Sequence, residues 1–193
     1  MRTLYKSQTN AVLHLFDFCS FLTMPKLLAS TLLLLFVFSA TAQSQTVRIQ
    51  IVGGANLLFN VNSYSKVKNG ITYIDFTTIR VYYSDVNEDG TPNTSSMGWE
   101  LMVNAATELF MPDYGTVTMP LSVLKINSKC AGKEKSAVLG IGESLIAEWL
   151  PGMDVKDAVE DVVLSYELGT NKELFGYSSD YFSTDLVFTL KSR

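Results

Sequence analysis

Apolar and polar residues alternate with a period of two along much of the chain. The alternation is clearest in four segments: 46–52, 98–105, 162–168 and 181–190. Such alternation, with many β-branched and aromatic residues, is typical of strands that bury one face. Two longer segments, 71–83 and 117–126, change phase, the first at Thr77-Thr78 and the second where Val123 gives way to Leu124. These phase changes predict a bulge or a strand that switches sheets. Pro120, within the second segment, predicts an edge position or an interruption.

One segment, 142–163, has helical spacing instead. Four of its apolar residues fit a short amphipathic turn: Leu145, Ile146, Trp149 and Leu150. Asp154 is placed to cap a second turn over 155–162. Clusters rich in Gly, Asn and Asp separate the other segments. The pattern predicts an all-β fold, an antiparallel β-sandwich of Ig-like or Greek-key type with one or two short helical turns.

The segment 27–42 has the layout of a secretory signal peptide. It follows Lys26, has an apolar core shorter than the roughly 20 residues of a membrane span, and closes on Ala40-Thr41-Ala42. Met24 would start a compact signal peptide, so we expect an N-terminal extension from a misassigned start at 1–23, a signal peptide at 24–42 and one domain at 43–193. The mature protein is therefore expected to be secreted, in the periplasm or on the cell surface, and a bacterial source fits this signal.

Charge and rare residues exclude several classes of function. The whole chain has a formal net charge of −4, and 43–193 is more acidic and has no basic stripe, which disfavours nucleic acid and anionic membranes. The only histidine, His14, precedes 43, so His-dependent triads and His-ligated metal centres are excluded from the mature chain. Cys130 is then the single cysteine, and its polar neighbours predict a free thiol in a loop.

The sharpest chemical motif is Asp85-Val86-Asn87-Glu88-Asp89-Gly90, which matches the first half of a calcium loop. Asp85, Asn87 and Asp89 are the candidate ligands, and Ca²⁺ is the one cofactor considered. Position twelve is Ser96 rather than the bidentate Glu, and a strand precedes the motif. A turn built by Asp, Asn and Gly for their own backbone preferences is the alternative.

Two further kinds of candidate are less specific. Acidic pairs could serve glycoside hydrolysis if they met in a cleft; they are Glu143, Glu148, Asp154, Asp157, Glu160 and Asp161. Aromatic side chains outside the apolar phases could stack on sugars; they are Tyr82, Tyr177 and Tyr181. Solvated acids and packed aromatics are the alternative readings. Asn93-Thr94-Ser95 is formally a glycosylation sequon.

Trp99-Glu100-Leu101 lies in an alternating segment, and the last alternating segment ends Phe188-Thr189-Leu190. From Trp99 to the C-terminus this arrangement resembles WxL-type bacterial surface domains, and pilin-like secreted sandwiches more generally. The chain departs from the WxL pattern where Phe188 replaces the second Trp. The resemblance implies a surface-associated role without catalysis.

We therefore expect a secreted or cell-surface, adhesin-like binding or assembly module without catalytic activity. Its partner would be a cell-surface polymer or another surface protein, and segment 46–52 is the candidate for strand exchange with it. A carbohydrate- or calcium-binding extracellular module is the alternative, and an acid-based glycosidase is a remote one.

Overall fold

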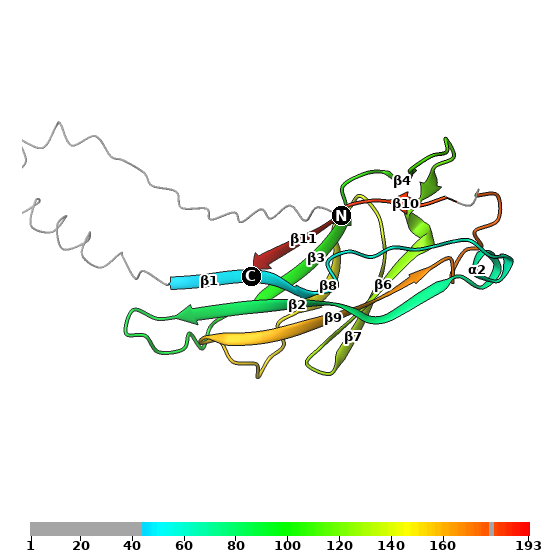
Figure 1. The fold of residues 1–193 in the computed structure, drawn as a ribbon. Helices are drawn as coiled ribbons and strands as arrows, with labels where there is room; N and C mark the ends of the chain where they lie inside the picture. The colour runs from blue at the N-terminus through cyan, green and yellow to red at the C-terminus, as the bar shows by residue number, and fades with distance from the viewer. Residues whose placement is uncertain (1–43, 178–179) are drawn as a thin grey trace, which may run out of the picture.

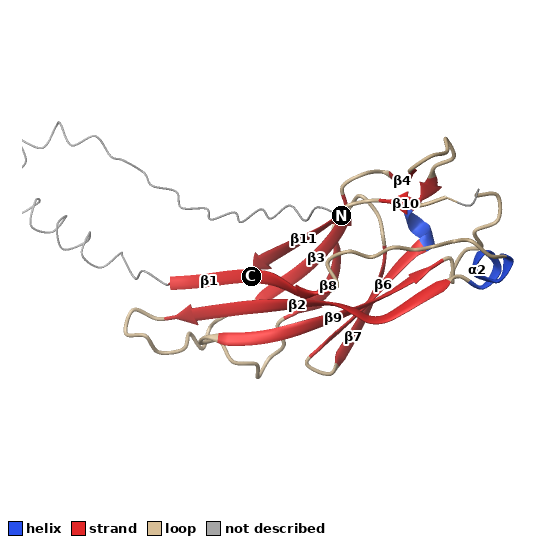
Figure 2. Ribbon diagram, viewed as in Figure 1, coloured by secondary structure: helices blue, strands red, loops and turns tan. Residues whose placement is uncertain are grey.

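The computed structural model describes residues 44–177 and 180–193 (Figures 1 and 2). The predicted extension at 1–23 and the predicted signal peptide at 24–42 lie outside these residues. The elements along the described chain are β1 (Ser44–Gly53), α2 (Tyr64–Asn69), β2 (Ile71–Val86), β3 (Trp99–Ala105), β4 (Leu109–Pro112), β5 (Met119–Pro120), the 3-10 helix η1 (Leu121–Val123), β6 (Leu124–Cys130), β7 (Lys133–Val138), β8 (Ser144–Glu148), β9 (Ala158–Leu168), β10 (Phe182–Ser183) and β11 (Leu186–Ser192).

The strands form three antiparallel sheets. The largest has five strands in the order β1-β2-β9-β6-β7, and a second has three strands in the order β11-β3-β8. A small third sheet, β10-β4-β5, lies at the same end of the molecule as α2 (Figure 1). The prediction of an all-β, antiparallel fold is confirmed.

The two larger sheets share one hydrophobic core. Ile79, Ile126 and Val162 come from the five-stranded sheet, and Leu101 and Ile146 come from the three-stranded one; each is at most 1% exposed, and all belong to a single buried cluster. Burial of this apolar surface is the main favourable term in folding. The alternating pattern of the sequence therefore reports which face of each strand looks into the shared core.

The phase change predicted in β2 is a real irregularity. The pairing of β2 with β9 loses its register between Tyr73 and Thr77, and Asp75 takes a positive φ of 49°. From Thr77 onward buried and half-exposed residues alternate strictly. The bulge thus shifts the apolar set from one phase to the other, a few residues before the position that the sequence indicated.

The helical prediction for 142–163 is wrong. This segment contains β8 and the start of β9, and Asp154 caps no helix. The register between β3 and β8 shifts at Ile146, so that Ile146 and Ala147 are both buried although they are consecutive. A bulge that turns two neighbouring residues inward breaks the period of two and resembles helical spacing.

The loop predicted around Cys130 is also wrong. Cys130 is the last residue of β6, which forms a hairpin with β7 through Ala131 and Gly132. Both turn residues have positive φ, 47° and 76°, as a two-residue hairpin turn requires. Polar residues in β6 gave the segment the composition of a loop.

The remaining strand predictions are confirmed in part. Segment 181–190 is broken at Thr184 and Asp185 into β10 and β11, which join different sheets. Segment 117–126 is interrupted as expected, with Pro120 at the boundary between β5 and η1. In both places the chain leaves one sheet and enters another. The change of phase in 117–126 predicted such a switch, whereas the unbroken alternation in 181–190 gave no sign of it.

The one described α-helix, α2, was not foreseen. The Ser63 hydroxyl accepts a hydrogen bond from the Lys66 backbone N–H at 3.4 Å, and Gly70 ends the helix with a φ of 75°. A Ser cap and a Gly at the end are ordinary helix signals, but a span of six residues is too short to show helical periodicity. No helix in 44–177 or 180–193 is long and apolar enough to cross a membrane.

Candidate binding edge

Strand β1 forms one edge of the five-stranded sheet. Within the described chain it pairs only with β2, in antiparallel register from Ser44 opposite Val86 to Ile51 opposite Ile79. Backbone groups alternate between the two sides of a strand, so about half of those in β1 point away from β2. A ten-residue row of this kind can pair with a further strand.

The apolar face of β1 is less well covered than that of its neighbour. Val47, Ile49 and Ile51 face the core but remain partly exposed. Their partners in β2 are almost fully buried: Tyr83 at 2%, Val81 at 1% and Ile79 at 0%. The core therefore thins out toward β1, and a strand added there would cover apolar surface.

The outer face of β1 is tied to β2 by polar contacts. The Arg48 guanidinium lies 4.2 Å from the centre of the Tyr82 ring, a cation–π geometry. The Gln50 side-chain carbonyl accepts a hydrogen bond from the Tyr82 hydroxyl at 3.2 Å. Arg48 is the only charged residue of the strand. These contacts attach β1 to β2. The strand itself contains no lysine and no proline.

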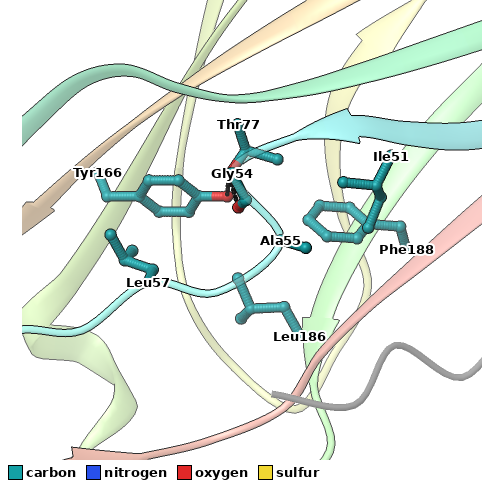
Figure 3. A pocket seen from close by; sticks show the side chains of 8 residues that line it. All are labelled: Ile51, Gly54, Ala55, Leu57, Thr77, Tyr166, Leu186 and Phe188. Carbon is teal, nitrogen blue, oxygen red and sulfur yellow. Dashed lines mark hydrogen bonds between the residues drawn. The ribbon is translucent and has the colours of Figure 1, made fainter.

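A small hollow lies between β1 and β11, the edge strand of the second sheet (Figure 3). It offers about 10 Å³ to the centre of a water molecule, which is close to the space that one water needs. Its lining residues are Ile51, Gly54, Ala55, Leu57, Thr77, Tyr166, Leu186 and Phe188. The hollow is therefore too small for a further strand.

One wall of the hollow carries a buried chain of hydrogen bonds. The Tyr166 hydroxyl donates to the Thr77 hydroxyl at 2.9 Å, which donates in turn to the Gly54 carbonyl at 2.7 Å. Burial raises the pKa of Tyr166 to about 12, against the opposing effect of the Thr77 hydrogen bond. These hydrogen bonds hold the loop after β1 against the core. The part of the sheet edge that stays available for pairing is therefore β1 itself.

The opposite edge of the same sheet, β7, is built differently. It begins Lys133-Glu134-Lys135, three consecutive charges. Lys135 forms an ion pair of 2.7 Å with Glu148 of β8, so the two sheets are linked on this side. The buried Ser128 hydroxyl, in the neighbouring β6, also donates to the Ile146 carbonyl of β8. Charge and interstrand contacts thus protect the β7 edge.

Of the predicted calcium ligands, Asp85 lies near the end of β2, and Asn87 and Asp89 lie on the loop that carries the chain toward β3. Asp85 is 4% exposed; one of its carboxylate oxygens accepts from the Asn93 side chain at 3.2 Å and the other from the Tyr83 hydroxyl at 3.3 Å. The Asp89 carboxylate accepts from the Thr91 N–H at 2.9 Å and from its hydroxyl, and these hydrogen bonds lower the pKa of Asp89.

The third candidate ligand, Asn87, donates its amide to Thr91 at 3.0 Å and to the Pro92 carbonyl at 3.3 Å. In the described chain no three His, Cys, Asp or Glu side chains converge on a point where an ion could sit. Every candidate ligand is engaged within the loop, so the calcium site stays a prediction. Asn93, the first residue of the sequon, is buried with its amide on Asp85.

The acidic candidates for hydrolysis run from Glu143, directly before β8, through β8 and the following segment to β9. Glu143 forms an ion pair with Lys191, and Asp161 pairs with Arg80 at 2.7 Å. The hydrogen bond from Lys135 lowers the pKa of Glu148, and that from Arg80 lowers the pKa of Asp161. A general acid needs a raised pKa, whereas the pKa of each of these two carboxyls is lowered.

The three predicted sugar-stacking tyrosines do not share a platform. Tyr82 lies on β2 under Arg48, while Tyr181 bridges to Asn60 near α2 and Tyr177 packs against the core. The structure instead brings together Tyr64 of α2, 70% exposed, and Phe175, 47% exposed, with ring centroids 5.9 Å apart. Sequence reasoning missed this pair because its members are 111 positions apart.

Cys130 is buried, and burial raises the pKa of its thiol to about 11. A thiol is a nucleophile only when ionised, so this cysteine is inert near neutral pH. Cys130 forms no disulfide among the residues that the structure describes, and the free thiol stays a prediction.

The two motifs that carry the WxL resemblance lie on neighbouring strands. Trp99 and Leu101 are buried on β3, and β11 pairs with it so that Leu190 stands opposite Leu101 and Phe188 opposite Val103. No protein-family model matches this chain, and no curated protein matches it.

Proposed function

We propose that this chain is a secreted or cell-surface, adhesin-like binding and assembly module without catalytic activity, built as a β-sandwich of Ig-like or Greek-key type. Its binding element is the outer edge of β1, which takes up an extended segment of another surface protein as a further strand. One observation carries the proposal: β1 is a ten-residue edge strand with a single charge, no proline and a partly exposed apolar face.

Addition at the edge fits better than insertion between the sheets. A strand inserted between β1 and β11 would need an open groove, and the hollow between Ile51 and Phe188 has room for about 10 Å³ only. The edge needs no rearrangement, because the free backbone groups of β1 face outward from the sheet. The resemblance to WxL-type and pilin-like secreted domains supports the same class of function, and the secretory layout of 24–42 supports its location.

A labelled peptide with the sequence of residues 78–86 tests the proposal at the outer edge, because in antiparallel register its apolar and polar faces match those of β1. We expect saturable binding by fluorescence anisotropy and slower amide hydrogen exchange in β1. The double substitution Thr46→Lys with Gln50→Lys should weaken binding at least tenfold, because lysines on an edge strand oppose pairing.

Ser136→Lys on β7 is the matched control, since Ser136 is an exposed residue of the opposite edge strand. It should leave peptide binding unchanged. Binding that responds equally to the two changes, or protection that appears on β7 instead of β1, would remove β1 as the binding element.

A carbohydrate-binding module is the second candidate, and the exposed ring pair of Tyr64 and Phe175 favours it. Aromatic faces stack on the apolar faces of sugar rings and exclude water from them. A glycan array should then give signals that Tyr64→Ala abolishes and that Tyr82→Ala, far from this pair, leaves intact. Silence of the wild-type protein across the array would rule out this candidate.

A further inference from the structure

We propose that the strand which β1 takes up is β1 of a second copy of this chain, in an antiparallel register centred on Ile49. This inference rests on the proposed function, because it names the occupant of the same edge. The result would be a two-fold symmetric dimer in which the two five-stranded sheets become one continuous sheet. A two-fold axis requires the same patch on both subunits, and β1 is complementary to itself only in certain registers.

The pleat restricts the registers first. Side chains on a strand alternate between faces, so inward residues must stand opposite inward residues of the other copy. The inward set of β1 includes Val47, Ile49 and Ile51, and the outward set includes Arg48 and Gln50. Antiparallel self-pairing then needs a residue, not a peptide bond, at its centre.

Side-chain chemistry chooses among the remaining centres. A centre at Arg48 places two arginines directly opposite each other, which is destabilising. A centre at Val47 places Ile49 opposite the polar Gln45, and a centre at Gln50 places Val47 opposite Gly53. Each of these three registers either leaves an apolar side chain without an apolar partner or places like charges opposite each other.

A centre at Ile49 avoids all of these conflicts. Ile49 meets Ile49 of the second copy, and Val47 meets Ile51 on both sides of the axis, so three inward apolar pairs form in succession. On the outer face Arg48 meets Gln50, whose side-chain carbonyl can accept from a guanidinium, and this pair occurs twice. Val52, 44% exposed at the end of the strand, is covered by Thr46 of the second copy.

The burial of β1 supports this occupant. Its three inward residues are only partly covered, whereas their neighbours in β2 are at most 2% exposed. The Val and Ile side chains of β1 in a second copy would pack against these three residues and extend the hydrophobic core by one strand. The self-complementary pattern thus explains why an edge of this length carries no lysine, proline or acidic residue to prevent pairing.

Charge substitutions test the register in the protein produced from the full chain. Gln50→Lys places a lysine opposite Arg48 twice per dimer, so we expect about a tenfold weaker dimer by sedimentation equilibrium. Gln50→Glu places a carboxylate there and should strengthen it. The double variant Arg48→Glu with Gln50→Lys restores opposite charges and should return the affinity toward that of the wild type. Ser136→Lys on β7 should change nothing.

Cysteine cross-linking tests the centre independently. In the proposed register the two residues at 49 face each other at about 5 Å between Cα atoms, within disulfide reach. Ile49→Cys should therefore give a covalent dimer on mild oxidation. Val47→Cys is the matched control, because the two copies of residue 47 lie about 13 Å apart along the strands. Cys130 is buried and does not interfere. Urea unfolding of each variant confirms that it is folded.

The outcomes separate this inference from the proposed function. A wild-type protein that stays monomeric at about 100 µM, or that cross-links equally through residues 47 and 49, overturns the inference. If the 78–86 peptide still binds β1 in that case, the proposed function stands with a different occupant. If neither the peptide nor a second copy binds, both fall. A dimer that weakens with Gln50→Lys and cross-links through residue 49 alone supports both.

Discussion

The two edges of the five-stranded sheet have opposite character. The β7 edge has three charges in its first three residues, and it is linked to the second sheet by the Lys135–Glu148 ion pair. The β1 edge has one charge, stacked on Tyr82, and no ion pair is found between it and the second sheet among residues 44–177 and 180–193.

Both edges belong to one sheet and one core, so the difference does not come from the fold. Charges on an edge strand oppose unwanted pairing, and covering an edge has the same effect. The chain uses both devices at β7 and neither at β1. The difference indicates that an open edge is retained at β1, and each experiment below tests one part of this contrast.

Truncating a side chain of the buried core should have the largest effect on the free energy of unfolding. Ile79→Ala removes a fully buried side chain and should lower the free energy of unfolding by about 2–5 kcal/mol. Ile51→Ala, directly opposite on β1, should cost clearly less because Ile51 is partly exposed. Urea denaturation measures both. Equal losses would mean that the core does not thin toward β1.

The contacts that link the β7 side of the five-stranded sheet to β8 should have the next largest effect on stability. Ser128→Ala removes the hydroxyl that donates to the Ile146 carbonyl, leaving a buried acceptor without its donor, so we expect a loss of about 1–3 kcal/mol. Ser136→Ala, at an exposed position on β7, serves as the control and should cost little. A Ser128 variant as stable as the control would show that this contact does not hold the two sheets together.

The ion pair between Lys135 of β7 and Glu148 of β8 should make the stability of the fold depend on pH. The hydrogen bond from Lys135 lowers the pKa of Glu148 below 4.5, so the folded state binds the proton less readily than the unfolded state. The stabilisation is therefore present above pH 4.5 and is lost as the pH falls through the lowered pKa. The stability difference between wild type and Glu148→Gln, at most about 1 kcal/mol at pH 7, should shrink by pH 3. A constant difference would contradict this assignment.

The loop beside the start of β1 should give the smallest effect. Asp89 is exposed and holds a turn through Thr91, so Asp89→Ala should lower the thermal midpoint only slightly. Millimolar calcium in the same measurement tests the predicted metal site at Asp85, Asn87 and Asp89. A calcium-dependent rise that disappears in Asp89→Ala would establish the metal site.

Much of the architecture could be predicted from local patterns. The alternation in 46–52, 98–105 and 162–168 identified β1, β3 and part of β9 because each has one face in the core. Prediction failed where local and tertiary demands differ. Segment 142–163 looks helical because a bulge turns both Ile146 and Ala147 inward and breaks the period of two. Strand β6 looks like a loop because its polar residues face solvent or, like Ser128, form a hydrogen bond to the other sheet.

The candidate edge was partly visible before folding. Segment 46–52 was expected as a strand available for pairing, from its position and pattern. The guarded β7 edge and the Tyr64–Phe175 pair were not foreseen, since no local signal tells which strands end up at an edge or which distant rings meet. Three of the acidic candidates, Glu143, Glu148 and Asp161, form ion pairs with lysines or arginines that no local pattern indicated.

By itself, the sequence determined that this is an antiparallel β protein whose residues 43–193 contain no histidine, because side-chain periodicity and composition are properties of the chain. The tertiary structure alone decided which strand stands uncovered at the rim of the sheet. Strand order depends on contacts between residues far apart in sequence, and those contacts form only when the whole core is buried.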